Sequence, residues 1–318
     1  MTHSPSPPNP LSRGERGLGG EGESLHPHAH QLHDRPVQVA MIDVHIHAVP
    51  PNLPGTGSLS PLLEKPLEEV AAVIRREMQQ AGATAAFSMG AWNAGENDPL
   101  GINQTLKIAA QVPGLKAIGI ADPMRNDADH FRQVEALLKS GVVVALKGYL
   151  GYLHFEPAHP NYRRYYELAA KYNIPFMFHT GDTYSPRAKL RFAHPLGVDD
   201  VAVDHPNTRF VICHIGNPWT IEAAEVIYKN MNVWGDLSGL MVGSDEVFTS
   251  DEGREAVVDL AQTIQKTIRF SERPNRFVYG TDWPLVSMAA YRDFILGAVP
   301  ENYRSMVFEE NARVLFRM

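Results

Sequence analysis

The chain of 318 residues is 44% hydrophobic, and its 36 acidic and 29 basic side chains give a formal net charge of −7. This length can bury one large core, while the acidic balance and the small size of the charge clusters argue against nucleic-acid binding and favour a small-molecule substrate. The single cysteine excludes an internal disulfide, and no apolar run approaches the roughly 18 residues of a membrane span.

The first 37 residues are rich in Pro, Gly, Ser and His, and they contain no apolar segment of the kind that directs export. We therefore expect a disordered tail over 1–37 and one domain over 38–318. Because export and membrane signals are missing, the expected location is the cytoplasm, with no membrane partner.

Beyond the tail, short apolar runs rich in β-forming residues alternate with helical stretches. Most of these runs are too short and too continuously apolar for amphipathic helices, and strands buried on both faces have this character. We expect strands over 37–47, 83–89, 115–121, 141–149, 174–180, 208–214, 232–238 and 276–282.

Helices are expected over 67–82, 127–141 and 161–173, where apolar residues recur at spacings of three and four. Gly82 and Gly141 are placed to end two of them, and a last helical segment near 300–316 is expected to pack on the outside. Eight βα units without a break in composition favour an α/β fold of the closed (β/α)8 TIM-barrel type. No G-x-G-x-x-G follows the first strand, which weakens the dinucleotide-binding alternative.

Side chains that can bind a metal stand at the ends of several predicted strands. His45 and His47 are two residues apart on strand 1, so their imidazoles project to one side, and His179, His214 and Asp282 close strands 5, 6 and 8. A lone histidine at a strand end is more often structural. The carboxyl ends of barrel strands converge on one rim, however, and imidazole with carboxylate suits Zn, Fe, Mn, Co or Ni.

These residues stand in the motifs D-V-H-I-H, F-H-T-G, C-H-I-G and Y-G-T-D-W-P, followed near the end of the chain by E-N-A-R-V-L-F. Over 38–316 the chain resembles the amidohydrolase superfamily, in particular the amidohydrolase-related branch that includes aminocarboxymuconate-semialdehyde decarboxylase-like enzymes. The resemblance implies one divalent ion, zinc as the first choice, held by His45, His47, His179 and Asp282. It also implies catalytic roles for His214 and Asp282, and similar proteins commonly form homodimers.

Lys147 in V-A-L-K-G stands where binuclear members of that superfamily carry a carboxylated lysine that bridges two metals. Many members of the amidohydrolase-related branch have a lysine there and use one metal. A second metal is therefore the less favoured alternative, behind a lysine that pairs with a carboxylate or contacts substrate.

Further residues near the strand ends allow weaker assignments. Asp43 could orient a ligand histidine or cap the barrel through backbone hydrogen bonds. Cys213 precedes His214 and should point away from the pocket. The Arg187 guanidinium would suit a substrate carboxylate, although solvated surface charge is the more common role of such a residue. Aromatic and histidine side chains just beyond strand ends could form a pocket wall or simply pack loops onto the barrel, and these are Trp92, Tyr149, Tyr152, His154, Trp219 and Trp283.

Three functions remain open on this pattern. In a hydrolase, water activated by the metal attacks a lactone, ester or amide, Asp282 carries the proton to the leaving group and His214 stabilises developing charge. In a decarboxylase, the same residues protonate carbon after carbon dioxide leaves. A catalytically inactive scaffold is the third alternative, and the presence of every ligand weighs against it. Lys147 and the lack of a further decarboxylase signature favour the hydrolase.

Overall fold

The computed structural model describes residues 40–318, so the tail expected over 1–37 lies outside the described residues. All eight strands are present, most of them shorter than the sequence predicts. They are β1 (Met41–Ile46), β2 (Ala83–Met89), β3 (Leu115–Ile120), β4 (Val143–Tyr149), β5 (Phe176–His179), β6 (Phe210–Ile212), β7 (Val233–Asp236) and β8 (Phe277–Val278).

The strands form one parallel sheet in the order β1 to β8, and the sheet closes on itself. Closure is made by the segment around β8: the Val44 N–H donates to the Tyr279 carbonyl at 3.0 Å, and the Asp282 N–H donates to the His45 carbonyl at 2.8 Å. Alternating strands and helices around a closed parallel sheet define the (β/α)8 TIM barrel, which confirms the predicted fold class.

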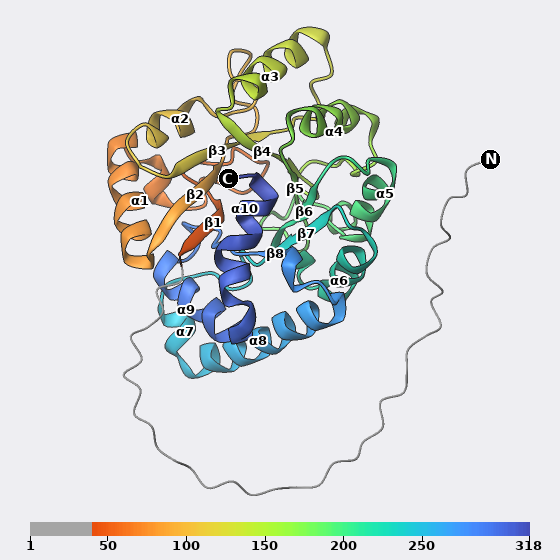
Figure 1. Cartoon of the computed structure of the whole chain (residues 1–318). Coiled ribbons are helices and arrows are strands. Elements are labelled where there is room, and N and C mark those ends of the chain that lie inside the picture. The colour runs from red at the N-terminus through yellow and green to blue at the C-terminus, as the bar shows by residue number, and fades with distance from the viewer. Residues whose placement is uncertain (1–39) are drawn as a thin grey trace, which may run out of the picture. The chain divides into compact units, whose positions relative to one another are not determined.

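Helices surround the barrel, as Figure 1 shows looking along its axis. They are α1 (Leu67–Ala81), α2 (Asn103–Ala109), α3 (Ala128–Ser140), α4 (Pro160–Tyr172), α5 (Leu196–Asp204), α6 (Thr220–Lys229), α7 (Glu246–Thr249), α8 (Asp251–Ser271), α9 (Met288–Ala298) and α10 (Asn311–Phe316). Gly82 and Gly141 end α1 and α3 in the left-handed conformation, at φ of 75° and 76°, as predicted. No helix within 40–318 is long and apolar enough to cross a lipid bilayer.

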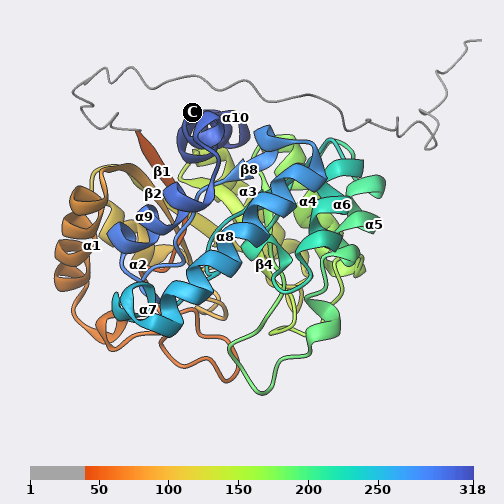
Figure 2. The ribbon, with the colours of Figure 1, turned by 90° about the horizontal axis from the view of Figure 1, so that it is seen from below.

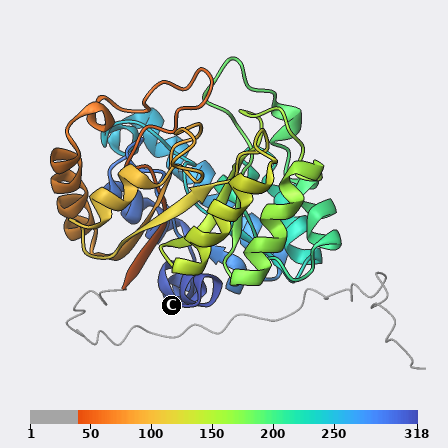
Figure 3. The same cartoon turned by 90° about the horizontal axis from the view of Figure 1, so that it is seen from above.

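The last helix departs from the sequence expectation, because it covers one end of the barrel instead of joining the outer ring. Ala312, Leu315 and Phe316 belong to the apolar cluster that fills the barrel interior, and the Phe316 ring centroid lies 4.7 Å from that of Phe87 in β2. Figures 2 and 3 show α10 at one end of the barrel and the loops that follow β1 and β5 at the other. The loop end is where the strands present their carboxyl termini.

Candidate metal centre

Three candidate ligands converge from the two strands that close the barrel. His45 lies in β1, His47 directly follows it, and Asp282 stands in the loop after β8. Their nitrogen and oxygen ligand atoms all lie within 4.8 Å of one another. The register of β1 against β2 shifts between Asp43 and Ile46, an irregularity of the kind that re-aims side chains beside active sites.

The Asp282 carboxylate is the centre of this arrangement. Its Oδ1 lies 3.4 Å from Nε2 of His45 and 3.2 Å from Nε2 of His47, and it makes no hydrogen bond within 40–318. A buried carboxylate oxygen without a hydrogen bond is costly, and two imidazole nitrogens beside it complete a donor set typical of divalent transition metals. The residues present therefore fit a metal ion.

His45 is held as a neutral imidazole with its lone pair on Nε2. Its Nδ1 donates to Oδ2 of Asp236 at 2.8 Å. Burial, with Lys147 nearby, lowers the pKa of His45 from 6.5 to about 4. A proton on Nδ1 leaves the Nε2 lone pair for a metal, and a carboxylate behind a ligand histidine is a recurrent feature of metal sites.

Asp236, at the end of β7, is the functional residue that the sequence analysis missed. It is fully buried, and its Oδ1 accepts backbone hydrogen bonds from His214 at 3.1 Å and from Ser238 at 2.9 Å. Burial alone would raise its pKa, but His45, which also donates a hydrogen bond to it, together with His214 and Lys147 holds the pKa of Asp236 well below 3.8. The signal was available in W-G-D-L-S, where a carboxylate ends an apolar strand just as Asp282 follows another.

His214 occupies a strained turn beyond β6. His214 and Ile215 both have left-handed backbones, at φ of 58° and 42°, and the second is a β-branched residue for which this conformation is rare. Such strain is characteristic of functional sites. The His214 ring lies against Ser238, whose hydroxyl is 3.0 Å from Nδ1, and its Nε2 is 3.1 Å from Nδ1 of His179.

The same turn corrects the expected orientation of Cys213 relative to His214. Strict alternation along a strand would point Cys213 away from His214. Cys213 keeps the alternation of β6 and faces the barrel interior as Val211 does, while the left-handed turn at His214 breaks the alternation, so that His214 lines the cavity as well. The Cys213 side chain is fully buried in the barrel interior, with its Sγ 2.9 Å from Nζ of Lys147. Burial raises the pKa of this thiol well above 9, so it stays protonated.

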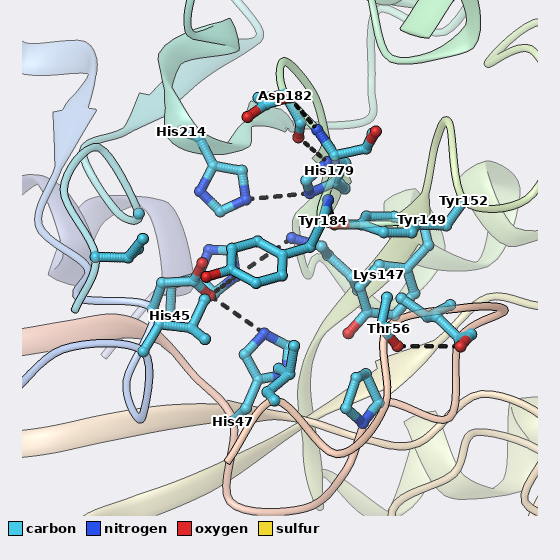
Figure 4. A pocket seen from close by; sticks show the side chains of 18 of the residues that line it. His45, His47, Thr56, Lys147, Tyr149, Tyr152, His179, Asp182, Tyr184 and His214 are labelled. Carbon is cyan, nitrogen blue, oxygen red and sulfur yellow. Dashed lines mark hydrogen bonds and ion pairs between the residues drawn. The ribbon is translucent and has the colours of Figure 1, made fainter. Parts of the chain in front are cut away.

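His179 stands beside His214, on the far side of the cavity from His47 (Figure 4). Its Nε2 lies 2.9 Å from the Asp182 carbonyl, an acceptor, so this nitrogen carries the proton. The free lone pair is then on Nδ1, the atom that His179 can offer to a metal. His179 does not belong to the cluster that joins His45, His47 and Asp282, so its assignment as a fourth ligand stays a prediction.

Lys147 lies in β4 and is fully buried below the candidate ligands. Its Nζ is 3.4 Å from Nε2 of His45 and 2.9 Å from Sγ of Cys213. The predicted carboxylate partner is not among these contacts. Asp43, by contrast, caps the backbone as one sequence alternative proposed: it accepts from the N–H groups of His45 and Thr281, each at 3.1 Å, and burial raises its pKa to about 7.

The candidate ligands open into a cavity of about 210 Å³ at the loop end of the barrel. Apart from His45, His47, Lys147, His179, His214 and Asp282, its walls are formed by Pro51, Leu53, Thr56, Leu59, Tyr149, Tyr152, Asp182, Thr183, Tyr184, Asn217, Gly239, Leu240, Val242 and Leu285. Among these described residues, Lys147 is the only lysine or arginine.

Of the sequence candidates for substrate contact, some line this wall and some do not: the first are Lys147, Tyr149 and Tyr152, and the second include Arg187, Trp219 and Trp283. Arg187 is not a lining residue, and its carbonyl accepts a hydrogen bond from His154 at 3.0 Å. The Trp219 ring packs beside that of His194, at a centroid separation of 4.9 Å. Trp283 is buried in the apolar layer between barrel and helices. Rim position alone therefore did not decide which of these side chains would face the cavity.

Comparison with known proteins agrees with the fold and the ligand pattern. The family model described as amidohydrolase matches residues 42–318, so the chain belongs to the amidohydrolase family. With its cluster of buried histidine and aspartate ligands, it is a metal-dependent enzyme of that family. No protein with a curated description matches the sequence.

Solved structures of similar fold include enzymes of two kinds. A 2,6-dihydroxybenzoate decarboxylase from Rhizobium is 15% identical, with a TM-score of 0.60 over 87% of this chain and 98% of that one. A 5-carboxyvanillate decarboxylase from Novosphingobium aromaticivorans, solved with manganese, is 11% identical, with a TM-score of 0.63 over 89% and 97%. A protein from Lactobacillus casei, proposed to be a metal-dependent hydrolase, is 14% identical, with a TM-score of 0.58 over 88% and 96%. At these identities the likeness concerns the fold.

Proposed function

We propose that this chain is a metal-dependent hydrolase that cleaves a lactone, ester or amide bond in a small substrate. The observation that carries the proposal is the buried Oδ1 of Asp282, which faces two imidazole Nε2 atoms and makes no hydrogen bond in the described part of the chain. A divalent ion, zinc first and Mn, Fe, Co or Ni as alternatives, would supply Lewis-acid polarisation and lower the pKa of water there towards about 7.

Two side chains of this protein can then handle the proton. Although burial opposes ionisation, the surrounding histidines keep the pKa of Asp282 well below its ordinary value, so the carboxylate is available as a proton acceptor. His214 lies close to Asp282, because both side chains approach the backbone of Gly239. A Cβ added to that glycine would be 2.7 Å from Nδ1 of His214 and 2.8 Å from Oδ2 of Asp282.

The direction of hydrogen bonding assigns different tasks to these two groups. Nδ1 of His214 lies 3.1 Å from the Ser238 carbonyl, an acceptor, so in the neutral ring this nitrogen carries the proton and the lone pair is on Nε2, towards the cavity. When Nε2 also takes up a proton, the ring can donate a hydrogen bond to an oxygen that gains negative charge. Asp282 accepts the proton that water loses and delivers it to the leaving group, so the bond is cleaved with no net change in protonation of the chain.

Decarboxylation is the second candidate, and the aromatic character of the cavity favours it. Tyr149, Tyr152 and Tyr184 line the cavity together with leucine and valine side chains, a setting that suits a planar aromatic acid. The decarboxylases of similar fold act, by their names, on such acids. In this reaction the carbon–carboxylate bond breaks, carbon dioxide leaves, and His214 or Asp282 supplies the proton that replaces it.

Metal content of the purified protein, measured by elemental analysis, tests the proposal first. We expect about one equivalent in the wild-type protein and in His154→Ala, which alters an exposed histidine outside the cavity lining, and a loss of metal in His45→Ala and Asp282→Ala. The metal-loaded protein would then be assayed on lactones, esters and amides by acid release, and on aromatic carboxylates by carbon dioxide release. A protein that binds no metal under any loading condition would be an inactive scaffold.

A further inference from the structure

The Tyr149 hydroxyl is a buried polar group with no role in holding the fold together. Tyr149 ends β4, is 3% exposed and lines the cavity, and its hydroxyl has no hydrogen-bond partner within residues 40–318. Buried hydroxyls are normally satisfied, because desolvating a donor without replacing its water partner costs free energy. An unsatisfied hydroxyl at a cavity wall is therefore placed for a partner that enters the cavity.

The position of the Tyr149 ring is fixed from two sides. Nζ of Lys147 lies 5.6 Å from its centroid, and the Tyr152 ring packs edge-on at 6.3 Å. The β4–β5 register sets Tyr149 opposite His179, and Figure 4 shows it on the same wall as that histidine. A donor on a strand, held by packing, keeps its direction when a ligand arrives.

Comparison with other tyrosines separates this hydroxyl from structural ones. The Tyr152 hydroxyl accepts the N–H of Tyr184 at 2.8 Å and so anchors the loop after β5. The Tyr162 hydroxyl, in α4, is also buried and unpartnered among the described residues, but Tyr162 packs on Phe176 and Phe178 in the outer layer and does not line the cavity.

Two other unsatisfied atoms belong to residues of the cavity wall, Nδ1 of His47 and Oδ1 of Asp282. The second is an acceptor, which a cation satisfies. The Tyr149 hydroxyl carries a proton that it can donate, and an oxygen or nitrogen with a free lone pair can accept it. Burial raises the pKa of this phenol well above 10, and it keeps its proton throughout the neutral range.

We propose that the Tyr149 hydroxyl is a further catalytic group, which donates a hydrogen bond to the substrate carbonyl oxygen as that oxygen gains negative charge. The inference rests on the proposed hydrolase function. It also specifies the substrate class, because it requires a carbonyl whose oxygen reaches the β4 side of the cavity. A donor fixed before the reaction stabilises the charged state more than the ground state, so it acts on kcat more than on KM.

The variant Tyr149→Phe removes the hydroxyl and keeps the ring. We expect its kcat on the hydrolysed substrate to fall about 100-fold or more, as for the loss of other oxyanion donors, with metal content, KM and melting temperature close to those of the wild-type protein. Tyr162→Phe is the matched control, because it removes a buried and unpartnered hydroxyl away from the cavity; its kcat should be unchanged. If Tyr149→Phe keeps kcat within threefold of an active wild type, this inference is wrong and the hydrolase proposal stands.

If the wild-type protein hydrolyses none of the lactones, esters and amides, a binding measurement tests the donor role of Tyr149 instead. Benzohydroxamate, which chelates divalent ions through two oxygens, would be titrated calorimetrically into the manganese-loaded wild-type protein and Tyr149→Phe. A dissociation constant at least tenfold larger in the variant than in the wild-type protein supports the donor role, even if the hydrolase proposal fails. Equal constants overturn the donor role, and no binding by the loaded wild-type protein overturns both.

Discussion

The Asp236 carboxylate accepts a hydrogen bond of 2.8 Å from Nδ1 of His45, although the two residues are 191 positions apart in the sequence. The same carboxylate accepts the backbone N–H of His214 at 3.1 Å, so one buried side chain orients a candidate metal ligand and the strained turn of a candidate catalytic residue. The following predictions test how the chain maintains this arrangement.

Replacement of Asp236 by asparagine should weaken metal binding. In Asp236→Asn the amide oxygen can still accept from the backbone, which turns the amide N–H group towards His45 and makes Nδ1 an acceptor. The His45 proton then moves to Nε2, where it blocks coordination. We expect metal affinity to fall about 10- to 100-fold, measured by competition with a chromophoric chelator. Asp199→Asn, which removes a half-buried carboxylate partner of Lys229 outside the cavity lining, is the control, and equal affinities in both variants would contradict the prediction.

A methyl group at Gly239 should damage the site directly. An alanine Cβ there would lie 2.7 Å from His214 and 2.8 Å from Asp282, on a backbone with φ of 64°. Gly57 has nearly the same φ, 63°, and open space around it, so Gly57→Ala controls for backbone strain alone. Both variants should melt at a lower temperature, but only Gly239→Ala should lose metal and activity. Similar metal content in the two variants would show that the contact is tolerated.

The stability of the metal-free protein should rise with pH between about 4 and 6.5. Burial lowers the pKa of His45 to about 4, and burial also lowers the pKa of His179, so in this window the unfolded chain binds protons that the folded chain does not. Stability is then lost as pH falls, by about 1.4 kcal/mol per pH unit for each group. Asp43, with its pKa raised to about 7, offsets one of the two histidines, because the folded chain binds a proton there that the unfolded chain does not, and one group's slope remains. Urea unfolding at several pH values in the presence of a chelator measures the free energy of unfolding and its slope with pH. His45→Asn should have a smaller slope, and an unchanged slope would assign the dependence to other groups.

Replacement of Lys147 should leave one equivalent of metal bound. Its Nζ contacts Sγ of Cys213 and Nε2 of His45, and without carboxylation Lys147 does not belong to the cluster of His45, His47 and Asp282. Lys147→Met keeps the volume of the side chain approximately. Elemental analysis of both proteins checks the prediction, because two equivalents in the wild type and one in the variant would mean that Lys147 bridges two ions.

The sequence by itself determined the barrel and the approximate place of the site. Short apolar runs alternating with amphipathic helices follow from burial on both faces of a parallel sheet, and this pattern is local, so all eight strands could be predicted. Because parallel strands end on one rim, His45, His47 and Asp282 could be expected to meet without knowledge of any contact.

Only the tertiary structure decided which side chains face the cavity. A strained turn at His214 let the neighbours Cys213 and His214 both face inwards, whereas alternation predicted opposite directions for them. Trp283 entered the outer apolar layer. The role of Asp236 depends on hydrogen bonds across the barrel, which no local pattern encodes. Periodicity reports burial, but whether a buried polar group has a partner depends on atoms far away in the sequence, and this is what distinguishes the Tyr149 hydroxyl from that of Tyr152.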